Sequence, residues 1–552
     1  MTAAPFDRTD AIDRLAALEF DVLVVGGGIT GLGCALDAVS RGLRTALIER
    51  DDFSSGTSSK SSKLVHGGIR YLQQGEVRLV YEALAERKVL RRNAPHLVSV
   101  LPFLIPIFSK SGIVPKQLAR AMGSAMWMYD LTGGIRIGKV HKRVSANEAL
   151  AEFPTLRAEH LMPSYIYYDA EADDSRLCIT VARTAADLGA VLVNRAAATG
   201  LRKDGSGRIT GATVVVDGRE IEVRARSIVS ATGVWADEMA SLDDPAHRPM
   251  IRPAKGIHIT VPWDKVRNRI AAVIPVPGDR RSVFVVPWGR FTFVGTTDTD
   301  YDGSIDDPQC TPDDVEYLLR ALNGAITEPV GVDDIVGTWA GLRPLVADPN
   351  ASGRTADLSR RHKVSVSSSG VVTITGGKLT TYRRMAADTI DAVVRDLGDG
   401  WRTRMRRRSR TKRLHLHGAD GHDALLARAD TLSPLGGEVV RHLVHRYGTD
   451  ATVVLALAEA DPDLARPLVP GLPNLRAEAV HAVRAEMATS LTDVLSRRTR
   501  ALLQARDDSL DAAPEVAALL ARELGWDDAE TARQVADYAA VVEAERRSLV
   551  DA

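Results

Sequence analysis

Near the start of the chain, a short apolar run leads directly into a cluster of glycines. The stretch DVLVVGGGITGLG (21–33) places Gly26, Gly28 and Gly31 in the spacing G-x-G-x-x-G. An uninterrupted apolar run is typical of a parallel strand buried on both faces. The first glycine allows a tight turn, the second lets the backbone approach a pyrophosphate, and the third lets the next helix pack closely. The sequence therefore predicts a dinucleotide-binding βαβ unit whose helix N-terminus faces the phosphates.

An acidic residue follows at the distance that such a unit requires. The segment RTALIER (44–50) has the composition of a second strand, and Glu49 stands near its end. In dinucleotide-binding units, an acid about 20 residues beyond the glycines binds the ribose hydroxyls. A second glycine-rich stretch, DGSGRITG (204–211), lacks the strand–helix setting, so we predict a hairpin turn there.

The segment after Glu49 favours a large cofactor. Residues 54–72, SSGTSSKSSKLVHGGIRYL, form a long stretch that is rich in hydroxyl side chains. A nicotinamide enzyme would return at once to a short βαβ crossover. A long polar loop instead suits a cofactor that lies extended, with its ring reaching another domain.

Charge and cysteine content narrow the function classes. Lys+Arg and Asp+Glu number 71 each, so the net charge is zero and gives no general attraction to nucleic acid. Cys34, Cys178 and Cys310 are far apart and fit neither a metal-ligand pattern nor a disulfide framework. We therefore expect no metal site and a reducing, cytoplasmic compartment. The N-terminus also lacks the basic-then-apolar profile of an export signal.

No run of the sequence approaches the ~20 apolar residues of a membrane span. The nearest, VSVLPFLIPIF (98–108), is interrupted by Pro102 and Pro106. We expect a buried strand followed by a loop in this stretch. The alternative is a segment that dips into a membrane surface.

Six blocks of the sequence carry a resemblance to a known family. They are GGGITGLG, TSSKSSKLVHGGIRYL, VYEALAERKVLRRNAPH, GTTDTD, GLRPL and GGKLTTYR. From about residue 15 to 545 the chain resembles the FAD-dependent glycerol-3-phosphate dehydrogenases of the D-amino-acid-oxidase-like flavoprotein superfamily. The resemblance implies FAD as cofactor and oxidation of sn-glycerol 3-phosphate to dihydroxyacetone phosphate. It also implies hydride transfer to flavin N5 and delivery of the electrons to a membrane quinone.

The resemblance implies an architecture that is α/β and α+β. A Rossmann-like FAD domain within residues 1–400 is assembled from discontinuous segments, and an antiparallel-sheet substrate domain is interleaved with it. Alternating apolar residues between 251 and 300 independently favour antiparallel strands, while 189–201 is predicted to be a helix end, a strand and a loop. The expected limits are about 15–100, 170–250 and 350–400 for the FAD domain, about 100–170 and 250–350 for the substrate domain, 401–415 for a basic linker, and 416–552 for an all-helical C-terminal domain.

The resemblance also implies which residues bind FAD. Besides the glycines of the first turn and Glu49, they lie in the hydroxyl-rich loop, at the A-T-G segment near 231–233, and in the block GGKLTTYR. They are Thr57, Ser58, Ser62, Lys63, Leu64, Gly67, Ala231, Gly233, Gly377, Lys378, Leu379 and Thr380.

A phosphorylated alcohol needs fixed cations around it. By the same resemblance, Arg343 and Arg360 bind the substrate, with the register between 360 and 361 left open, and Arg70 and Tyr71 form another pocket pair. Asp298 orients a basic group or the substrate. Lys378 lies beside flavin and substrate, and a cation at a helix start opposes the helix dipole, which favours a functional role there.

His258, in KGIHITVP, is the best-placed base for the hydroxyl proton, with Arg343 stabilising the forming alkoxide. The alternative is a histidine that is simply satisfied in the core or at the surface. An arginine is a poor base because of its high pKa.

The block WRTRMRRRSRTKR (401–413) is strongly basic. It is either a solvated linker or a surface that faces anionic lipid. With the family resemblance, this predicts peripheral association with the inner face of the cell membrane, and a homodimer is compatible with it. Two other functions stay open: a flavin oxidase that passes electrons to oxygen, and a non-catalytic FAD-bearing, membrane-associated protein.

Overall fold

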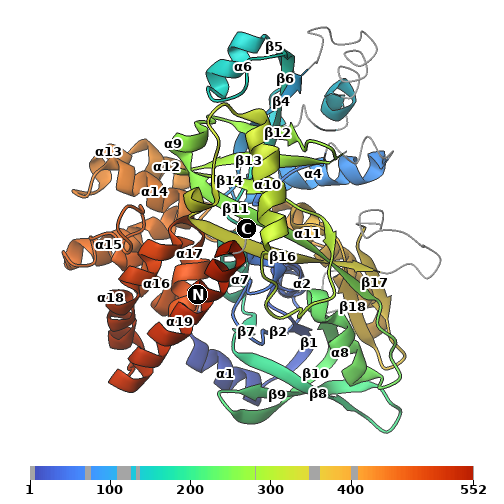
Figure 1. Cartoon of the computed structure of the whole chain (residues 1–552). Helices are drawn as coiled ribbons and strands as arrows, with labels where there is room; N and C mark the ends of the chain where they lie inside the picture. The colour runs from blue at the N-terminus through green and yellow to red at the C-terminus, as the bar shows by residue number, and fades with distance from the viewer. Residues whose placement is uncertain are drawn as a thin grey trace.

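The fold comes from a computed structural model (Figure 1). It describes residues 6–68, 76–108, 126–131, 133, 137–279, 281–346, 361–398 and 408–550.

One sheet has a parallel centre made of strands that are far apart in the sequence. Its strand order is β17-β18-β10-β1-β2-β7, with β17 antiparallel to β18 and a β8–β9 hairpin paired to β10. The apolar run after Asp21 forms the central strand β1, which is buried as predicted. The strands are β1 (Glu19–Val25), β2 (Thr45–Ile48), β7 (Val191–Val193), β8 (Ala196–Lys203), β9 (Ile209–Val216), β10 (Arg219–Ser230), β17 (Lys363–Val366) and β18 (Val371–Thr375).

Helices cover this sheet and place the glycine-rich turn at its edge. The helix after the turn, α2, packs against both α7 and α11 (Figure 1). The helices that accompany the sheet are α1 (Arg8–Ala17), α2 (Ile29–Ser40), α7 (Asp174–Asp187), α8 (Ala236–Asp243) and α11 (Tyr382–Leu397).

The second sheet is mainly antiparallel and lies above the first in Figure 1. Its order is β15-β11-β14-β13-β12-β4-β6-β3, with β16 added to β11 and β5 added to β6; β12 and β4 pair in parallel. The strands are β3 (Leu64–Val65), β4 (Ser99–Phe108), β5 (Lys142–Val144), β6 (Leu161–Glu171), β11 (Ile251–Pro262), β12 (Ala271–Pro275), β13 (Ser282–Trp288), β14 (Phe291–Gly295), β15 (Thr299–Asp300) and β16 (Gly337–Val346).

Four helices accompany the second sheet in the described part of the chain. The long helix α10 packs on β11, β12, β13 and β14, while α4 contacts the short 3₁₀ turn that precedes α11. The four are α4 (Val77–Asn93), α6 (Ala146–Glu152), α9 (Trp263–Val266) and α10 (Pro312–Ala325).

The C-terminal part is helical and sits beside both sheets (Figure 1). Buried ion pairs fasten it to the first sheet's layer: Arg498 Nη1 lies 2.7 Å from an Asp52 oxygen, and Arg500 pairs with Asp173 and Asp174. Such pairs are costly to break because a lone buried charge remains. The helices are α12 (His422–Ala427), α13 (Ala429–Leu432), α14 (Gly437–Tyr447), α15 (Ala451–Ala460), α16 (Arg476–Glu486), α17 (Ala501–Gln504), α18 (Arg506–Leu524) and α19 (Asp528–Val550).

The predicted fold class is confirmed, but two local predictions are wrong. The strand expected within 98–108 is present as β4 (Ser99–Phe108), but the expected loop is not, because the strand continues to Phe108; Pro106 fits because the pairing with β6 shifts between Ile105 and Ile107. The segment 189–201, expected to end in a loop, instead ends in β8, because pairing with β9 overrides the weak strand propensity of its alanines.

The predicted domain limits stay a prediction. The first sheet draws on residues 19–48, 191–230 and 363–375, and the second draws on 64–65, 99–171 and 251–346. Within the described ranges, no helix is both long enough and apolar enough to cross a membrane.

Candidate active site

The glycine-rich turn joins β1 to α2; two of its positions have no room for a side chain, and a third is crowded. Gly26 adopts φ +110°, and a Cβ there would lie 2.6 Å from the Ala231 carbonyl oxygen. A Cβ on Gly31 would lie 1.9 Å from the Gly26 carbonyl oxygen. Gly28 precedes the first residue of α2 and would place a Cβ 3.1 Å from Ser58 Oγ. The turn therefore leaves bare backbone at the N-terminus of α2, which suits a phosphate group.

A cavity of about 390 Å³ opens on this turn. At one end it reaches the β8 alanines, Met239 and Leu242, which offer an apolar surface to an aromatic base. At the other end it reaches the loop 376–379, beside Pro344 of β16. The cavity therefore extends from the first sheet to the second, as expected for a flavin nucleotide bound in an extended conformation. The predicted cofactor residues that line it are Gly26, Gly28, Glu49, Thr57, Ser58, Ala231, Gly233, Gly377, Lys378 and Leu379.

Glu49 lies in the cavity wall where the sequence predicts a ribose contact. Its Oε2 accepts a hydrogen bond from the Gly27 amide at 2.6 Å, and Oε1 accepts one from the Asp51 amide at 2.8 Å. Burial raises the pKa of Glu49 to about 7, although both amide contacts oppose this shift. The two backbone contacts fix the carboxyl group at the end of β2, where it can accept hydrogen bonds from ribose hydroxyls.

Other predicted cofactor residues already have protein partners. Ser58 Oγ accepts from the Ile29 amide at 2.9 Å and so caps α2, while Thr57 Oγ1 donates to the Leu342 carbonyl at 2.6 Å. Thr380 Oγ1 accepts from the His66 amide at 3.1 Å. The Gly67 amide donates to Asp169 Oδ1 and Tyr129 Oη, at 3.2 and 3.3 Å. These contacts hold the loop after residue 56 in place.

The far end of the cavity is a second glycine turn. Gly376 and Gly377 both have positive φ, at +71° and +88°, and a Cβ on Gly377 would lie 2.4 Å from Met385 Sδ. Lys378 follows in extended backbone before a 3₁₀ turn, and α11 begins only at Tyr382. This end therefore presents backbone and Lys378 to the cavity, next to β16.

His258 lies on β11 and is 2% exposed. Its ring stacks on Trp339, with ring centroids 4.6 Å apart and planes 9° apart, and its Nε2 lies 2.8 Å from Ser62 Oγ. Gly295, opposite His258 on β14, leaves the space for the ring: a Cβ there would lie 2.1 Å from His258 Cδ2. The predicted base is thus wedged between three strands of the second sheet.

The pKa of His258 is lowered well below its usual value. Burial is the main cause, and the charges of Lys63 and Arg343 add to it. His258 Nδ1 is buried and has no hydrogen-bond partner among the described residues. The imidazole is therefore neutral near pH 7 and keeps an unused ring nitrogen.

Arg343 lies on β16, and its side chain extends over β11. Its Nη1 donates to Asp298 Oδ1 at 3.1 Å, and its Nη2 donates to the Thr297 carbonyl at 3.2 Å. Gly256 makes the room, since a Cβ there would lie 2.5 Å from Arg343 Nη2. The structure brings Asp298 to Arg343 as a partner that orients the guanidinium group.

Lys63 connects the loop to the same cluster. Its ammonium group lies 3.5 Å from Asp174 Oδ1 and 4.5 Å from the centre of the Trp339 ring. Burial lowers the pKa of Lys63 to about 8, and Asp174 opposes this shift. Leu64, the next predicted residue, pairs with Glu171 in β3–β6. Lys63 and His258 thus both lie against the Trp339 ring, and Ser62 lies within hydrogen-bond distance of His258.

Three predicted substrate residues, Arg70, Tyr71 and Arg360, lie outside the described residues. Arg361, the alternative in the open register, is described, and its Nη2 lies 2.7 Å from Glu76 Oε2 at the surface.

One contact near the cavity escaped the sequence interpretation. Arg50 and Trp235 both line the cavity, and both donate to Asp306 Oδ1, each at 2.8 Å. The Arg50 guanidinium also lies over the Trp235 ring, 5.0 Å from its centre. The three residues come from separate segments, so no local motif signals them; only the position of Arg50, directly after Glu49, hinted at a role.

Comparison with known proteins identifies the family. The profile described as "FAD dependent oxidoreductase" matches residues 21–383, and that described as "C-terminal domain of alpha-glycerophosphate oxidase" matches 409–531. Glycerol-3-phosphate dehydrogenase 2 of Mycobacterium tuberculosis is 41% identical over 547 residues, covering 98% of this chain and 91% of the relative. The human mitochondrial glycerol-3-phosphate dehydrogenase is 38% identical over 549 residues, covering 94% and 73%.

A solved structure agrees over the whole length. The glycerol-3-phosphate dehydrogenase from Bacillus halodurans, complexed with FAD, has a TM-score of 0.79 and 28% identity and covers 98% of this chain and 97% of its own. The cavity, its two glycine turns and Glu49 fit the same cofactor here. The chain therefore belongs to the FAD-dependent glycerol-3-phosphate dehydrogenases of the D-amino-acid-oxidase-like superfamily.

Proposed function

We propose that this chain oxidises sn-glycerol 3-phosphate to dihydroxyacetone phosphate and that the electrons pass to a membrane quinone. The observation that carries this proposal is the position of Arg343. Asp298 and the Thr297 carbonyl orient its guanidinium group, and the next residue, Pro344, lines the same cavity as Lys378. The proposal therefore places these two cations, Arg343 beside a lining residue and Lys378 in the lining itself, where a phosphorylated substrate needs them.

When bound, FAD supplies the acceptor for the hydride that leaves C2 of the substrate, at flavin N5. Arg343 and Lys378 bind the anionic substrate and stabilise the negative charge that develops on its C2 oxygen. Arg70, Tyr71 and Arg360 belong to the same proposal on the strength of the family resemblance.

His258 accepts the hydroxyl proton in this proposal. If His258 Nε2–H donates to Ser62 Oγ, then Nδ1 carries the lone pair that accepts it. The low pKa of the free histidine opposes protonation, because Lys63 and Arg343 repel a third positive charge. A bound phosphate dianion offsets these two cations, so substrate binding itself strengthens the base.

Anaerobic bleaching of the bound flavin tests the substrate. We expect glycerol 3-phosphate to bleach the flavin of the holoenzyme rapidly and glycerol to bleach it at least 100-fold more slowly, because glycerol leaves the pocket cations unpaired. Equal bleaching by both alcohols would contradict a phosphate-binding role for these cations. A yellow protein that neither alcohol bleaches would favour the non-catalytic alternative.

The electron acceptor needs a separate measurement. We expect fast reduction of a soluble quinone analogue with little hydrogen peroxide. Steady peroxide production at a rate that quinone does not change would instead support an oxidase.

We also propose peripheral binding to the anionic inner face of the cell membrane, on the cytoplasmic side, with a homodimer as the assembly. Support for the membrane comes from the basic block 401–413 and from the family, in which the human relative is named as mitochondrial. Co-flotation with anionic vesicles, but not with neutral ones, tests the first proposal, and light scattering tests the second.

A further inference from the structure

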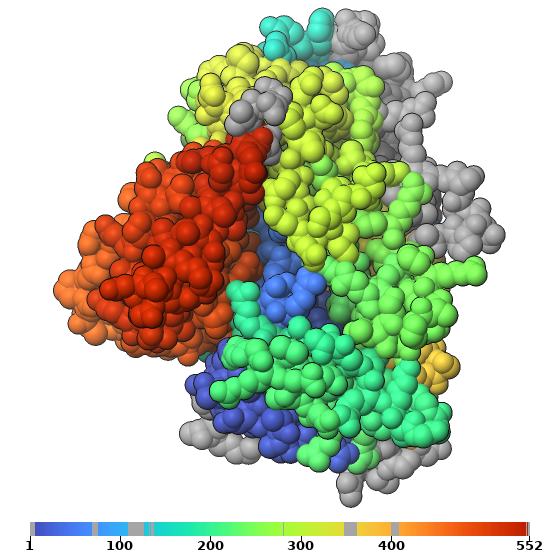
Figure 2. Space-filling view, turned by 60° about the horizontal axis from the view of Figure 1, so that its bottom comes forward, coloured from blue at the N-terminus to red at the C-terminus, as the bar shows by residue number. Residues whose placement is uncertain are grey.

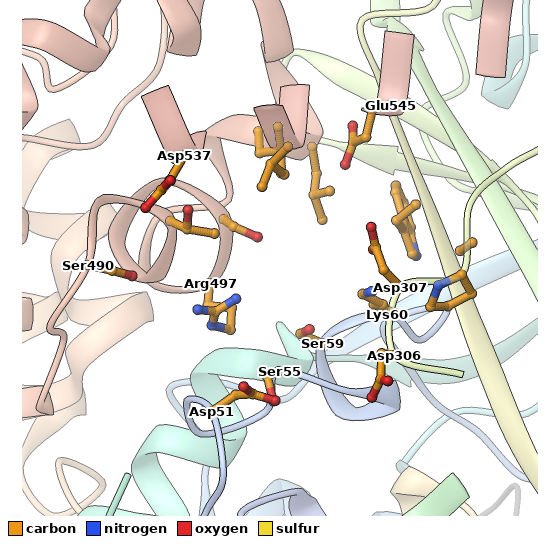
Figure 3. Close-up of a pocket in the computed structure, with 18 of the residues that line it drawn as sticks. Asp51, Ser55, Ser59, Lys60, Asp306, Asp307, Ser490, Arg497, Asp537 and Glu545 are labelled. Carbon is orange, nitrogen blue, oxygen red and sulfur yellow. The ribbon is translucent and has the colours of Figure 1, made fainter. Parts of the chain in front are cut away.

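A cleft of about 830 Å³ lies between the C-terminal helices and the two sheets. Figure 2 shows it as a hollow between the red helices and the yellow-green segments, and Figure 3 shows its interior, with Arg497 on the C-terminal side and Lys60 on the side of the hydroxyl-rich loop. Arg500 of the C-terminal part and Trp339 of β16 both line this cleft. The helix α17 begins directly after Arg500 and packs on β16. The C-terminal part therefore reaches the strand that carries Arg343.

Arg500 is fixed at this junction and points away from solvent. Its backbone φ is +67°, and only 2% of its side chain is exposed. Its Nε lies 3.1 Å from Asp173 Oδ1, and its Nη2 donates to Asp174 Oδ1. The Arg506 amide donates to the Val336 carbonyl at 2.9 Å and so anchors the following segment next to β16. Arg500 thus brings a guanidinium group of the C-terminal part to the start of α7.

Asp174 is the point at which this guanidinium group meets the hydroxyl-rich loop. Its side chain is fully buried, and its Oδ2 accepts hydrogen bonds from the Ser61 amide at 3.0 Å and from Ser61 Oγ at 2.7 Å. Its Oδ1 faces both Arg500 and the ammonium group of Lys63, which lies 3.5 Å away. Hydrogen bonds to an ionised acceptor are stronger than those between neutral groups. Asp174 therefore fixes the backbone of Ser61 and the charge of Lys63 together.

The loop needs such support because Lys63 has an unfavourable backbone conformation. Its φ is +55°, in the left-handed region that residues other than glycine seldom adopt. Such a conformation persists only where its surroundings hold it. The Lys63 amide donates to Ser61 Oγ at 3.0 Å, and the Lys63 carbonyl accepts from the Ala172 amide at 2.9 Å. Ser61 bonds Asp174, and Ala172 lies two residues before it, so both supports lead back to this carboxylate.

The loop held in this way supplies two contacts to the cluster around His258. Ser62 Oγ lies 2.8 Å from His258 Nε2, and the Lys63 ammonium group lies 4.5 Å from the centre of the Trp339 ring. Trp339 Nε1 also donates to the Ser61 carbonyl at 3.2 Å. A displacement of the loop would therefore move the hydroxyl group that contacts the base and the cation beside it. Misplacement by about 1 Å at a reacting centre can cost roughly 10²-fold in rate.

The two aspartates differ in how far they depend on Arg500. Asp173 has a second arginine, Arg446, whose Nη1 lies 3.5 Å from its Oδ2. Among the described residues, Asp174 pairs with Lys63 and Arg500 alone. Loss of Arg500 would leave Lys63 as the counter-ion of a buried carboxylate, which draws the ammonium group toward that carboxylate.

We propose that Arg500, from the C-terminal helical part, is a positioning residue for the oxidation of the alcohol. Acting through Asp174, it holds the hydroxyl-rich loop so that His258 stays aligned to accept the proton. This inference rests on the proposed oxidation of glycerol 3-phosphate. In that proposal Arg343 and Lys378 bind the anionic substrate, so Arg500 should influence the rate of the chemical step rather than substrate binding.

Stopped-flow reduction of the bound flavin by glycerol 3-phosphate tests the inference on the FAD-loaded full chain. We expect Arg500→Met to lower the limiting rate per bound flavin about tenfold, with at most about a twofold change in the substrate concentration that gives half of it. Arg500→Lys should recover at least about a third of the parent's rate, because an ammonium group can still pair with one aspartate. Arg498→Met is the matched control, since Arg498 is also buried but pairs with Asp52. It should lower the urea midpoint to a similar degree and keep the parent's rate.

A milder variant keeps the test decisive if Arg500→Met does not fold. Ser61→Ala removes only the hydroxyl group between Asp174 and the Lys63 amide, and we expect it to lower the same rate about threefold. Combined with Arg500→Lys, it should cost less than the product of the two single effects, because both act through Asp174.

Three results would overturn the inference: equal rates for Arg500→Met and Arg498→Met, an Arg500→Lys variant no faster than Arg500→Met, or a Ser61→Ala variant as fast as the parent. Each of them presupposes that glycerol 3-phosphate bleaches the parent's flavin. A parent that the substrate does not bleach would instead overturn the proposed function, and the inference with it.

Discussion

The glycine-rich turn and the cluster around His258 are the two ends of the active site proposed above, and they are made of different atoms. At the turn, backbone atoms of Gly26, Gly28 and Gly31 form the surface, and the nearest obstacles to a side chain at Gly26 and Gly31 are themselves backbone oxygens. Around His258, the surface is made of side chains, and the glycines Gly256 and Gly295 serve only to make room for them.

The two ends should therefore respond differently to mutation. A backbone site cannot yield without moving a strand or helix, so damage there should cost the fold and the cofactor together. A side-chain site can lose one group while the sheet beneath it stays intact. Stability and flavin content should report on the first end, and kinetic constants on the second.

The largest effect is expected at Gly31. Gly31→Ala places a Cβ 1.9 Å from the Gly26 carbonyl oxygen, so α2 must move away from β1. We expect a loss of at least about 3 kcal/mol in the free energy of unfolding, at the upper end of overpacking costs, together with loss of bound FAD. Urea unfolding and flavin absorbance measure both. Gly205→Ala is the matched control, because nothing lies within 4 Å of a Cβ there. If Gly31→Ala kept its FAD, the turn would have adapted to the added methyl group, and the prediction would be contradicted.

The second effect concerns Arg343 and leaves the cofactor in place. Arg343→Met should lower kcat/KM for glycerol 3-phosphate by roughly 10²–10³-fold, the usual cost of one charge-stabilising donor, with full flavin content. The Asp298 side chain is buried, so Arg343→Met combined with Asp298→Asn also removes the negative charge that Arg343 contacts and separates folding from chemistry.

Gly256→Ala sharpens this test without removing a charge. The new methyl group would meet Arg343 Nη2 at 2.5 Å and Thr296 Oγ1 at 2.6 Å, so it displaces the guanidinium group. We expect about a tenfold loss in kcat/KM, smaller than for Arg343→Met because the cation remains nearby. A normal kcat/KM in Gly256→Ala would argue that the position of Arg343 does not matter.

The contrast also explains what the sequence could predict. Gly26, Gly28, Gly31 and Glu49 lie within one βαβ unit, so their spacing along the chain sets their spacing in the fold, and the cavity at this turn was located from the pattern alone. The stack of His258 on Trp339 has no such local origin.

That stack depends on strand register between distant segments. β11 and β16 pair with His258 opposite Trp339 and Ala254 opposite Arg343. A shift by one residue would turn these side chains to the other face of the sheet. Family resemblance supplied Arg343 and His258, but Trp339, Asp174 and Asp306 fall in no motif and came only from the fold.

A third, smaller effect should appear in the pH dependence. Burial and the charge of Lys63 keep the pKa of His258 far below 6.5, so His258 stays neutral and causes no loss of kcat/KM as the pH falls from 7 to 6. Lys63→Met removes that charge, so the pKa of His258 should rise toward its usual value and an acid limb should move to higher pH. Rates are taken per bound flavin, and Lys265→Met, at a surface lysine, is the control. Superimposable profiles for Lys63→Met and the parent would show that the charge of Lys63 does not control the protonation of the base.

The smallest effect is expected at a side-chain contact beside the nucleotide cavity, at the same end as the glycine-rich turn. Asp306 accepts from both Arg50 and Trp235, which line the nucleotide cavity, but its own side chain is 61% exposed. Exposed ion pairs contribute little, so Asp306→Asn should speed FAD dissociation only about threefold, equivalent to less than about 1 kcal/mol. High salt should reduce the difference between Asp306→Asn and the parent, because it screens the parent's ion pair. Asp307→Asn is the matched control. Asp307 is the next residue along the chain, and no bond joins its carboxylate to Arg50 or to Trp235. If Asp306→Asn instead released FAD as readily as Gly31→Ala, retention of the cofactor would depend on side chains at this end too, and the division between a backbone end and a side-chain end would fail.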